Sequence, residues 1–182
     1  SAPVQAWTRA LGAGASPAVV TDRVIATRRD STTGAITCTA LDLPTGALLW
    51  ERTLPPGKNV SAPSLAGGQV FLELALNDSS RNEVRCLSAV DGSDVWTASL
   101  PFATPVGRSL AVTDESVFVT MHTISMSNAE VTVCRVLNRA DGSLRFDLQA
   151  VQTASPTWAP CVRGNEVMMV TGGSLWQWDA VT

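Results

Sequence analysis

The chain has 182 residues, a formal net charge of −3, 45% hydrophobic residues and 16% charged residues. This length and composition are typical of a globular domain with a substantial core and exclude an intrinsically disordered chain. The mild acidity argues against a nucleic-acid partner, because phosphate recognition needs clustered cations and the sequence offers only Arg28-Arg29, followed at once by Asp30.

Strand signals follow one another along the whole chain, whereas helix signals are poor. Glycine and proline recur every few residues, and no stretch keeps a 3.6-residue period for three turns. Short segments rich in β-branched residues and bounded by turn residues predict strands. In chain order they are RVIATR (23–28), AITCTALD (35–42), ALLWERTL (47–54), QVFLELAL (69–76), EVRCLSAV (83–90), SVFVTM (116–121), EVTVCRVL (130–137) and EVMMV (166–170).

One pattern returns at nearly equal intervals along these strands. It reads ALDLPTGALLW at 40–50, LSAVDGSDVW at 87–96 and LNRADGSLRF at 137–146, and its beginning returns as WDAVT at 178–182. The turn glycines are 46 and then 50 residues apart, and an aromatic residue follows each of them four positions later; the pairs are Gly46 and Trp50, Gly92 and Trp96, and Gly142 and Phe146. Self-similarity at such a period indicates a repeat architecture.

The glycine and the aromatic residue each have a physical reason. A tight hairpin between two strands needs a positive φ angle at one position, which glycine adopts without a Cβ clash. A large side chain such as Trp50 or Trp96 covers much of a sheet face that must be buried against its neighbour, and the indole N–H needs one hydrogen-bond partner.

The period and the short strands predict an all-β fold, a β-propeller of four-stranded antiparallel blades. We expect a single propeller, whose last repeat is completed by a fourth strand formed by residues 3–11, because Trp7 aligns with Trp50. Such closure would remove an exposed sheet edge. The repeats are expected at about 12–54, 55–100, 101–150 and 151–182 plus 1–11. Three assemblies remain open at this point: a four-bladed ring within one chain, an eight-bladed ring of two chains, and an arc of a longer protein.

The stretch ALDLPTGALLW (40–50) resembles the repeat of the PQQ-like (pyrroloquinoline quinone-type) β-propellers. This family includes quinoprotein alcohol dehydrogenases and the outer-membrane assembly lipoprotein of the BAM complex. Quinone-binding members resemble one another in a vicinal Cys-Cys disulfide, a Trp under the cofactor and a Glu/Asn/Asp set around calcium. This sequence has no adjacent pair of cysteines. The resemblance therefore implies the fold without the quinone, and we expect no cofactor, no metal and no catalytic residue.

The loops between the second and third strands of three repeats are long and polar, at 28–34, 77–83 and 122–130. In a propeller they share one rim, where loops on a rigid scaffold can build a recognition surface. The plain alternative is a set of solvated loops without a partner. Trp158 precedes a first strand and is expected to line an axial pocket or an interface, or simply to fill the ring. The candidate binding residues are Arg28, Arg29, Asn77, Arg81, His122 and Trp158.

Other residues that could act in catalysis or metal binding have simpler explanations. His122 lacks a visible nucleophile or carboxylate partner, so a surface or strand-end position is the simpler expectation. The four cysteines have no CxxC spacing, so we expect no zinc site, and we expect Cys38, Cys86 and Cys134 to be small core residues rather than members of disulfides. Trp176 and Trp178 lie where the third strand of the last repeat is expected, and we expect one on each side of the sheet.

These observations predict a non-enzymatic binding or assembly scaffold that engages a protein or a small ligand through its rim loops. The alternatives are a fragment of a quinoprotein dehydrogenase and a small-ligand or sugar-binding sensor domain. No apolar run approaches the roughly 18 to 20 residues of a membrane-spanning helix, so we expect no membrane span. A homodimer would follow if two chains formed the eight-bladed ring. The resemblance implies a periplasmic or secreted protein.

Overall fold

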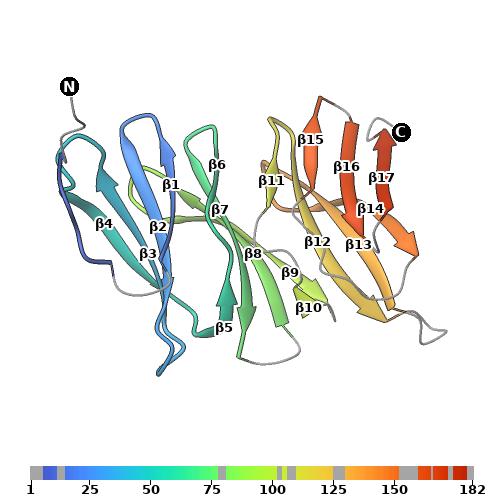
Figure 1. The fold of residues 1–182 in the computed structure, drawn as a ribbon, viewed down its shortest axis with the longest axis horizontal. Helices are drawn as coiled ribbons and strands as arrows, with labels where there is room; N and C mark the ends of the chain where they lie inside the picture. The colour runs from blue at the N-terminus through green and yellow to red at the C-terminus, as the bar shows by residue number, and fades with distance from the viewer. Residues whose placement is uncertain are drawn as a thin grey trace.

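Four antiparallel sheets follow one another along the chain in a computed structural model (Figure 1). The structure describes residues 6–11, 15–77, 81–101, 104–105, 110–124, 130–151, 160–164, 166–171 and 174–179. The described residues contain no helix, and in particular none with the length and hydropathy of a membrane span. We number the sheets 1 to 4 in chain order.

Each sheet is a meander of neighbouring strands. Sheet 1 contains β1 (Ser16–Val20), β2 (Arg23–Arg29), β3 (Ile36–Asp42) and β4 (Leu48–Leu54). In sheet 2, β5 (Gly57–Val60) and β6 (Ser64–Ala66) both pair with β7 (Gln69–Leu76), which is followed by β8 (Arg81–Ser88) and β9 (Asp94–Pro101). In sheet 3, β10 (Thr104–Pro105) and β11 (Ala111–Val112) pair with β12 (Ser116–Ile124), followed by β13 (Glu130–Asn138) and β14 (Leu144–Val151). Sheet 4 contains β15 (Cys161–Arg163), β16 (Glu166–Thr171) and β17 (Ser174–Asp179).

The repeat in the sequence corresponds to a strand register that is repeated from sheet to sheet. The first residue of each second strand pairs with the same position of the third strand, as Arg23 does with Asp42 and Glu166 does with Asp179. In sheets 1 to 3, the register between the third and fourth strands shifts at one equivalent place, for example between Ala40 and Leu41. Equivalent residues of different sheets can therefore be compared one by one.

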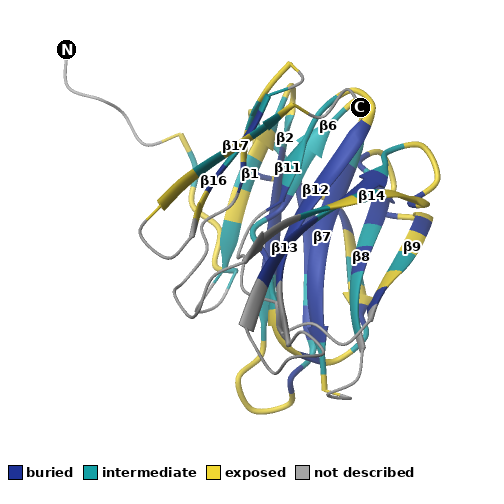
Figure 2. Cartoon of the chain, turned by 90° about the vertical axis from the view of Figure 1, so that its right-hand side faces the viewer, coloured by how far each residue is buried: buried dark blue, intermediate teal, exposed yellow. Residues whose placement is uncertain are grey.

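The core lies between the sheets rather than inside them. One cluster joins sheets 1 and 2 and contains Ile25 and Val70, the next joins sheets 2 and 3 around Phe71, and the third joins sheets 3 and 4 around Phe118. Second strands such as β7 and β12 are buried on both faces, as Figure 2 shows. This explains why QVFLELAL reads as an almost continuous apolar run rather than as an alternating one.

A tryptophan contacts the turn that holds a glycine of the following sheet in the same way three times. Gly46, Gly92 and Gly142 have φ angles of 69°, 73° and 73°. The indole N–H of a tryptophan in the preceding segment donates to the carbonyl three positions before the turn glycine. The bonds run from Trp7 Nε1 to Leu43 O (2.7 Å), from Trp50 Nε1 to Ala89 O (3.0 Å) and from Trp96 Nε1 to Arg139 O (2.8 Å). In sheet 3 the equivalent aromatic residue, Phe146, is half-buried against the cluster between sheets 3 and 4.

Two expectations about the chain ends and the last strand were wrong. Residues 6–11 form no strand and are not part of sheet 4, whose described strands are β15, β16 and β17. Trp7 instead contacts the turn of sheet 1, which lies at the opposite end of the array from β17 (Figure 1). Trp176 and Trp178 are stacked on one side of β17, with ring centroids 6.0 Å apart, because residues two apart on a strand share a face.

Candidate binding groove between the second and third sheets

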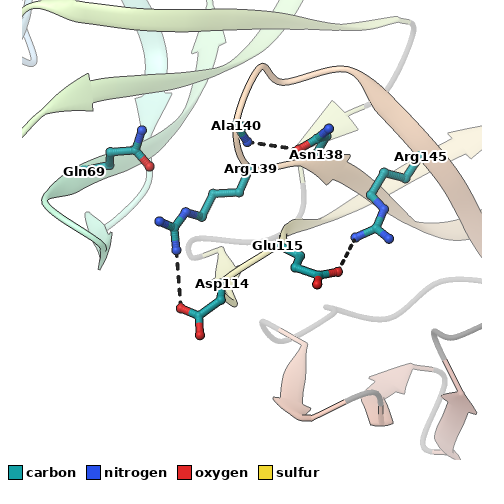
Figure 3. A pocket seen from close by; sticks show the side chains of 7 residues that line it. All are labelled: Gln69, Asp114, Glu115, Asn138, Arg139, Ala140 and Arg145. Carbon is teal, nitrogen blue, oxygen red and sulfur yellow. Dashed lines mark hydrogen bonds and ion pairs between the residues drawn. The ribbon is translucent and has the colours of Figure 1, made fainter.

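A groove with a volume of about 630 Å³ opens between sheets 2 and 3 (Figure 3). It lies at the edge of the array where the turns before β7 and β12 and the turn after β13 come together. Polar and charged side chains dominate its lining, which consists of Gln69, Asp114, Glu115, Asn138, Arg139, Ala140 and Arg145.

Two arginines of sheet 3 form the basic part of the groove. Arg139 Nη1 lies 3.3 Å from Thr113 O and 3.5 Å from Asp114 Oδ1. Arg145 Nη1 donates to Ser116 Oγ at 2.6 Å and lies 3.5 Å from Glu115 Oε2. The relative exposure of the side chains is 19% for Arg139 and 37% for Arg145, against 108% for Asp114 and 82% for Glu115. The carboxylates thus lie on the solvent side, in long contacts that water screens and that contribute little to stability.

Arg139 is fixed at both its backbone and its side chain. Its carbonyl accepts the hydrogen bond from Trp96 of sheet 2. Its guanidinium lies against Gly67, where a Cβ would collide with Nη2. Glycine at this turn position therefore leaves room for the arginine head, and Arg139 bridges the two sheets that form the groove.

The neighbouring boundary shows why the groove is open. Between sheets 1 and 2 the equivalent space is occupied by Arg23, whose Nη1 donates to Ala89 O at 2.7 Å and to Val90 O at 3.1 Å. Gln69 takes the place of Arg23 at the start of the second strand of sheet 2. Its side chain is shorter and neutral, and it lies across from Arg139 without filling the space (Figure 3).

The chemistry of the lining is suited to binding. Guanidinium groups donate paired hydrogen bonds to carboxylates, and the Gln69 and Asn138 amides add both donors and acceptors. The lining contains neither histidine nor cysteine. Among the described residues, no group of three or more His, Cys, Asp or Glu side chains is placed to hold a metal ion.

The predicted rim loops begin at the opposite edge of the sheets, where β2, β7 and β12 end (Figure 1). Arg29 and Asn77 come together around Gly34, and Arg29 Nε donates to Gly57 O at 2.5 Å, so it ties sheet 1 to sheet 2. Arg28 instead lines a small pocket of about 90 Å³ on the outer face of sheet 1, together with Arg9 and Glu51.

The remaining predicted residues are only partly described. The backbone of Arg81 pairs with Pro101, and that of His122 pairs with Thr104 and Thr132. Trp158 lies outside the described residues. A binding surface made by these three residues stays a prediction.

Glu73 is a buried residue that the sequence analysis did not single out. It is 2% exposed, and neither carboxylate oxygen has a hydrogen-bond partner among the described residues. Burial raises the pKa of this carboxyl to about 8. The signal was present in the sequence, since Glu73 is the one charged residue inside the apolar run VFLELAL.

The sheets, their repeated register and the tryptophan contacts define a β-propeller built from PQQ-like repeats. A model of the family described as outer membrane protein assembly factor BamB matches residues 4–79 and 80–182, and the chain belongs to this family. The predictions of an all-β propeller and of PQQ-like repeats are thus confirmed. A search of curated proteins gave no match.

Solved structures show the same fold at low sequence identity. BamB from Moraxella catarrhalis is 16% identical with a TM-score of 0.58, and the match covers 87% of this chain and 46% of that one. A europium-containing methanol dehydrogenase is 15% identical with a TM-score of 0.51, over 74% of this chain and 24% of that one. The β-propeller domain of the Trilobed protease from Pyrococcus furiosus is 10% identical with a TM-score of 0.53, over 89% and 55%. This chain therefore spans about half or less of the length of these structures.

The cysteines do not fit the quinone-binding set of the dehydrogenases. All four are free thiols, and each lies in a different sheet. Burial raises the pKa of the thiols of Cys38, Cys86 and Cys134 to about 12, whereas Cys161 is exposed. No adjacent pair is available in the sequence for a vicinal disulfide, so we derive no reaction through a quinone.

Proposed function

We propose that this chain is a non-catalytic binding scaffold that holds an acidic segment of a partner protein in the groove between sheets 2 and 3. The observation that carries the proposal is the pair Arg139 and Arg145 in an open groove, with exposed carboxylates as their present partners. The family description, an outer-membrane assembly factor, supports a role in assembly rather than in catalysis. By the same family relation we propose a periplasmic or secreted location.

The proposal requires that carboxylates of the partner replace Asp114 and Glu115 as the groups bound to the two arginines. The contacts of Asp114 and Glu115 are 3.5 Å long and exposed to solvent, so giving them up costs little. A partner carboxylate can form shorter, paired hydrogen bonds to a guanidinium. Little free energy is spent on ordering the protein side, because Arg139 is already fixed between Trp96 and Gly67.

The test is the affinity for a fluorescein-labelled peptide of alternating Glu and Gly, measured by anisotropy at low salt. The double variant Arg139→Gln/Arg145→Gln should bind at least about tenfold more weakly, which corresponds to 1.4 kcal/mol. The matched control is Arg163→Gln, an arginine of sheet 4 whose side chain is 83% exposed. It should leave the affinity unchanged. Equal losses in both variants, or no binding by the unaltered chain, would overturn the proposal.

A second measurement addresses catalysis. If the chain is a scaffold, adding pyrroloquinoline quinone with calcium should leave the melting temperature unchanged. A rise that saturates with quinone concentration would indicate a specific site, because a ligand that binds the native state stabilises it. That result would replace the scaffold with a quinoprotein fragment.

A further inference from the structure

The turn between β11 and β12 differs from the equivalent turns of sheets 1 and 2. Two residues separate β1 from β2 and β6 from β7, whereas Thr113, Asp114 and Glu115 separate β11 from β12. In sheet 2 the turn consists of Gly67 and Gly68, which carry no side chains. The longer turn of sheet 3 therefore brings two consecutive carboxylates to the groove, and the turn of sheet 2 leaves the opposite wall open.

The shape of this acidic turn (residues 113–116) is set by its backbone and by Thr113. The backbone N–H of Thr113 donates to Ser116 O at 2.9 Å, and the backbone N–H of Ser116 donates to Thr113 Oγ1 at 3.0 Å. The backbone N–H of Arg139 donates to Glu115 O at 2.9 Å and anchors the turn to the end of β13. The backbone that carries the two carboxylates is thus fixed without help from their side chains.

The two carboxylates of the acidic turn reach different arginines. Asp114 Oδ1 lies 3.5 Å from Arg139 Nη1, and Glu115 Oε2 lies 3.5 Å from Arg145 Nη1 (Figure 3). Two consecutive residues of one chain therefore span both guanidinium groups. This arrangement shows which spacing of acidic side chains fits the two arginines at the same time.

Each arginine has a further contact that does not involve a carboxylate. Arg139 Nη1 donates to Thr113 O at 3.3 Å, and Arg145 Nη1 donates to Ser116 Oγ at 2.6 Å. A guanidinium group has five N–H donors, so it can bind a new carboxylate while these bonds remain. Both arginines therefore keep their places when the side chains of Asp114 and Glu115 turn away into solvent.

We propose that the acidic turn is an internal substitute for the ligand of the groove, and that the partner presents two consecutive acidic residues that displace Asp114 and Glu115. This inference rests on the proposed function, which is the binding of an acidic segment. It adds the spacing of the acidic residues in that segment. It also adds a competitor within the chain, which lowers the affinity for every ligand that uses the same two arginines.

The competition explains why consecutive acidic residues are needed. A competitor in the same chain acts at a high effective concentration, although its exposed contacts are individually weak. A ligand with one carboxylate exchanges one such contact for another and gains little. A ligand with two consecutive carboxylates replaces both contacts, and its first carboxylate places the second without a further loss of translational freedom.

The competition also determines how salt affects binding. Dissolved ions weaken exposed ion pairs. In the unaltered chain they weaken the internal contacts together with the contacts to the ligand, so the two effects partly cancel. When the acidic turn is made neutral, only the contacts to the ligand are weakened. The affinity should then fall more steeply as the salt concentration rises.

Neutralising the acidic turn is the first test. Asp114→Asn/Glu115→Gln keeps the size of both side chains, and the turn keeps its hydrogen bonds from Thr113. The probe is a fluorescein-labelled peptide with one Asp-Glu pair among glycines and serines, and its affinity is measured by anisotropy. The neutral turn should raise the affinity about fivefold and make its salt dependence steeper. An unchanged or lower affinity would refute the competition.

A matched control separates competition from net charge. Asp22→Asn/Glu166→Gln removes the same charge from ion pairs with Arg23 and Arg163, which lie outside the groove lining. This control should leave both the affinity and the salt dependence unchanged. An equal rise in both double variants would mean that the peptide responds to the net charge of the protein, and the internal competitor would be refuted.

A second peptide tests the spacing. It has the same composition, but glycines separate its Asp from its Glu. The unaltered chain should bind the peptide with the adjacent pair at least about threefold more tightly, because a linker that matches the span between two sites gives the highest effective concentration. Equal affinities for the two peptides would refute the requirement for consecutive acidic residues.

The variant Arg139→Gln/Arg145→Gln distinguishes a failure of this inference from a failure of the proposed function. If this variant loses peptide binding while the neutral turn has no effect, the groove binds acidic segments without an internal competitor, and only the present inference is refuted. If neither the unaltered chain nor the chain with the neutral turn binds either peptide, the proposed function is refuted and this inference with it.

Discussion

Trp50 covers Gly92 of the following sheet so closely that a Cβ at Gly92 would lie 2.8 Å from the ring atom Cε3. The same indole donates to Ala89 O, three residues before the glycine. The turn glycine therefore has two functions, since it supplies a positive φ angle and leaves space for the tryptophan of the preceding sheet. Trp96 and Gly142 repeat this relationship at the next boundary.

A pair of glycine substitutions separates these two functions. Gly92 and Gly68 both have a φ of 73°, but a Cβ at Gly68 meets nothing within 4 Å. Gly68→Ala should lower the free energy of unfolding by about 1 to 2 kcal/mol, the cost of a left-handed backbone for alanine. Gly92→Ala should lower it by at least about 3 kcal/mol, because the tryptophan must also move.

Urea denaturation followed by circular dichroism measures both values. The difference between the two variants reports the contact with Trp50 alone, since the backbone term is shared. Equal losses would mean that the indole moves aside at no cost. The tryptophan would then not restrain the boundary between sheets 1 and 2.

Trp96→Phe should both destabilise the protein and lower the affinity of the groove for the acidic peptide. Phenylalanine retains the ring but cannot donate to Arg139 O, and this partly buried carbonyl loses its partner. We expect a loss of about 1 to 2 kcal/mol in unfolding free energy and weaker binding of the Glu/Gly peptide, because Arg139 loses a restraint. Unchanged peptide affinity in the folded variant would show that Arg139 is held by Gly67 and Thr113 alone.

The sequence was sufficient to predict the repeat, because the repeated residues form tight turns and contacts between neighbouring sheets. The spacing of Gly46, Gly92 and Gly142 predicted the hairpins, and the structure shows their positive φ angles. The position of residues 6–11 was not predictable in the same way. Alignment of Trp7 with Trp50 identified the type of contact, but whether this segment reaches the last sheet depends on the curvature of the whole array, which no local pattern encodes.

The groove could not be predicted from the sequence, for a different reason. It results from the difference between Arg23 and Gln69 at equivalent positions, and from a glycine at 67 that admits the head of Arg139. Such a space is visible only when three segments far apart in the sequence are placed together. Glu73, in contrast, was detectable, because a lone carboxylate in an apolar strand has to be buried if the strand is.

Glu73 should make stability depend on pH in a specific window. Burial raises the pKa of its carboxyl from 4.5 to about 8. The folded state therefore holds the proton more tightly than the unfolded state, and this stabilisation is complete below pH 4.5. It is lost as the pH rises from about 4.5 to 8, by a total on the order of 5 kcal/mol.

Glu73→Gln should remove this dependence and leave the protein more stable than the unaltered chain at pH 8. The measurement is the free energy of urea unfolding between pH 5 and pH 9. Glu115→Gln is the control, because that side chain is 82% exposed, and it should leave the slope of the profile unchanged. A profile that Glu73→Gln does not flatten would mean that a polar partner stabilises the ionised carboxylate.

Thiol labelling should distinguish the four cysteines by burial. One thiol per chain should react at once with a disulfide reagent, because Cys161 is exposed. Cys38, Cys86 and Cys134 are 0% exposed, and burial raises the pKa of each thiol to about 12. Since the thiolate is the reactive form, these three should react only at the rate of unfolding.

Cys161→Ser identifies the fast thiol, because it should abolish the fast phase and leave the slow one. A second fast thiol in that variant would show that a boundary between two sheets opens more often than the whole chain unfolds.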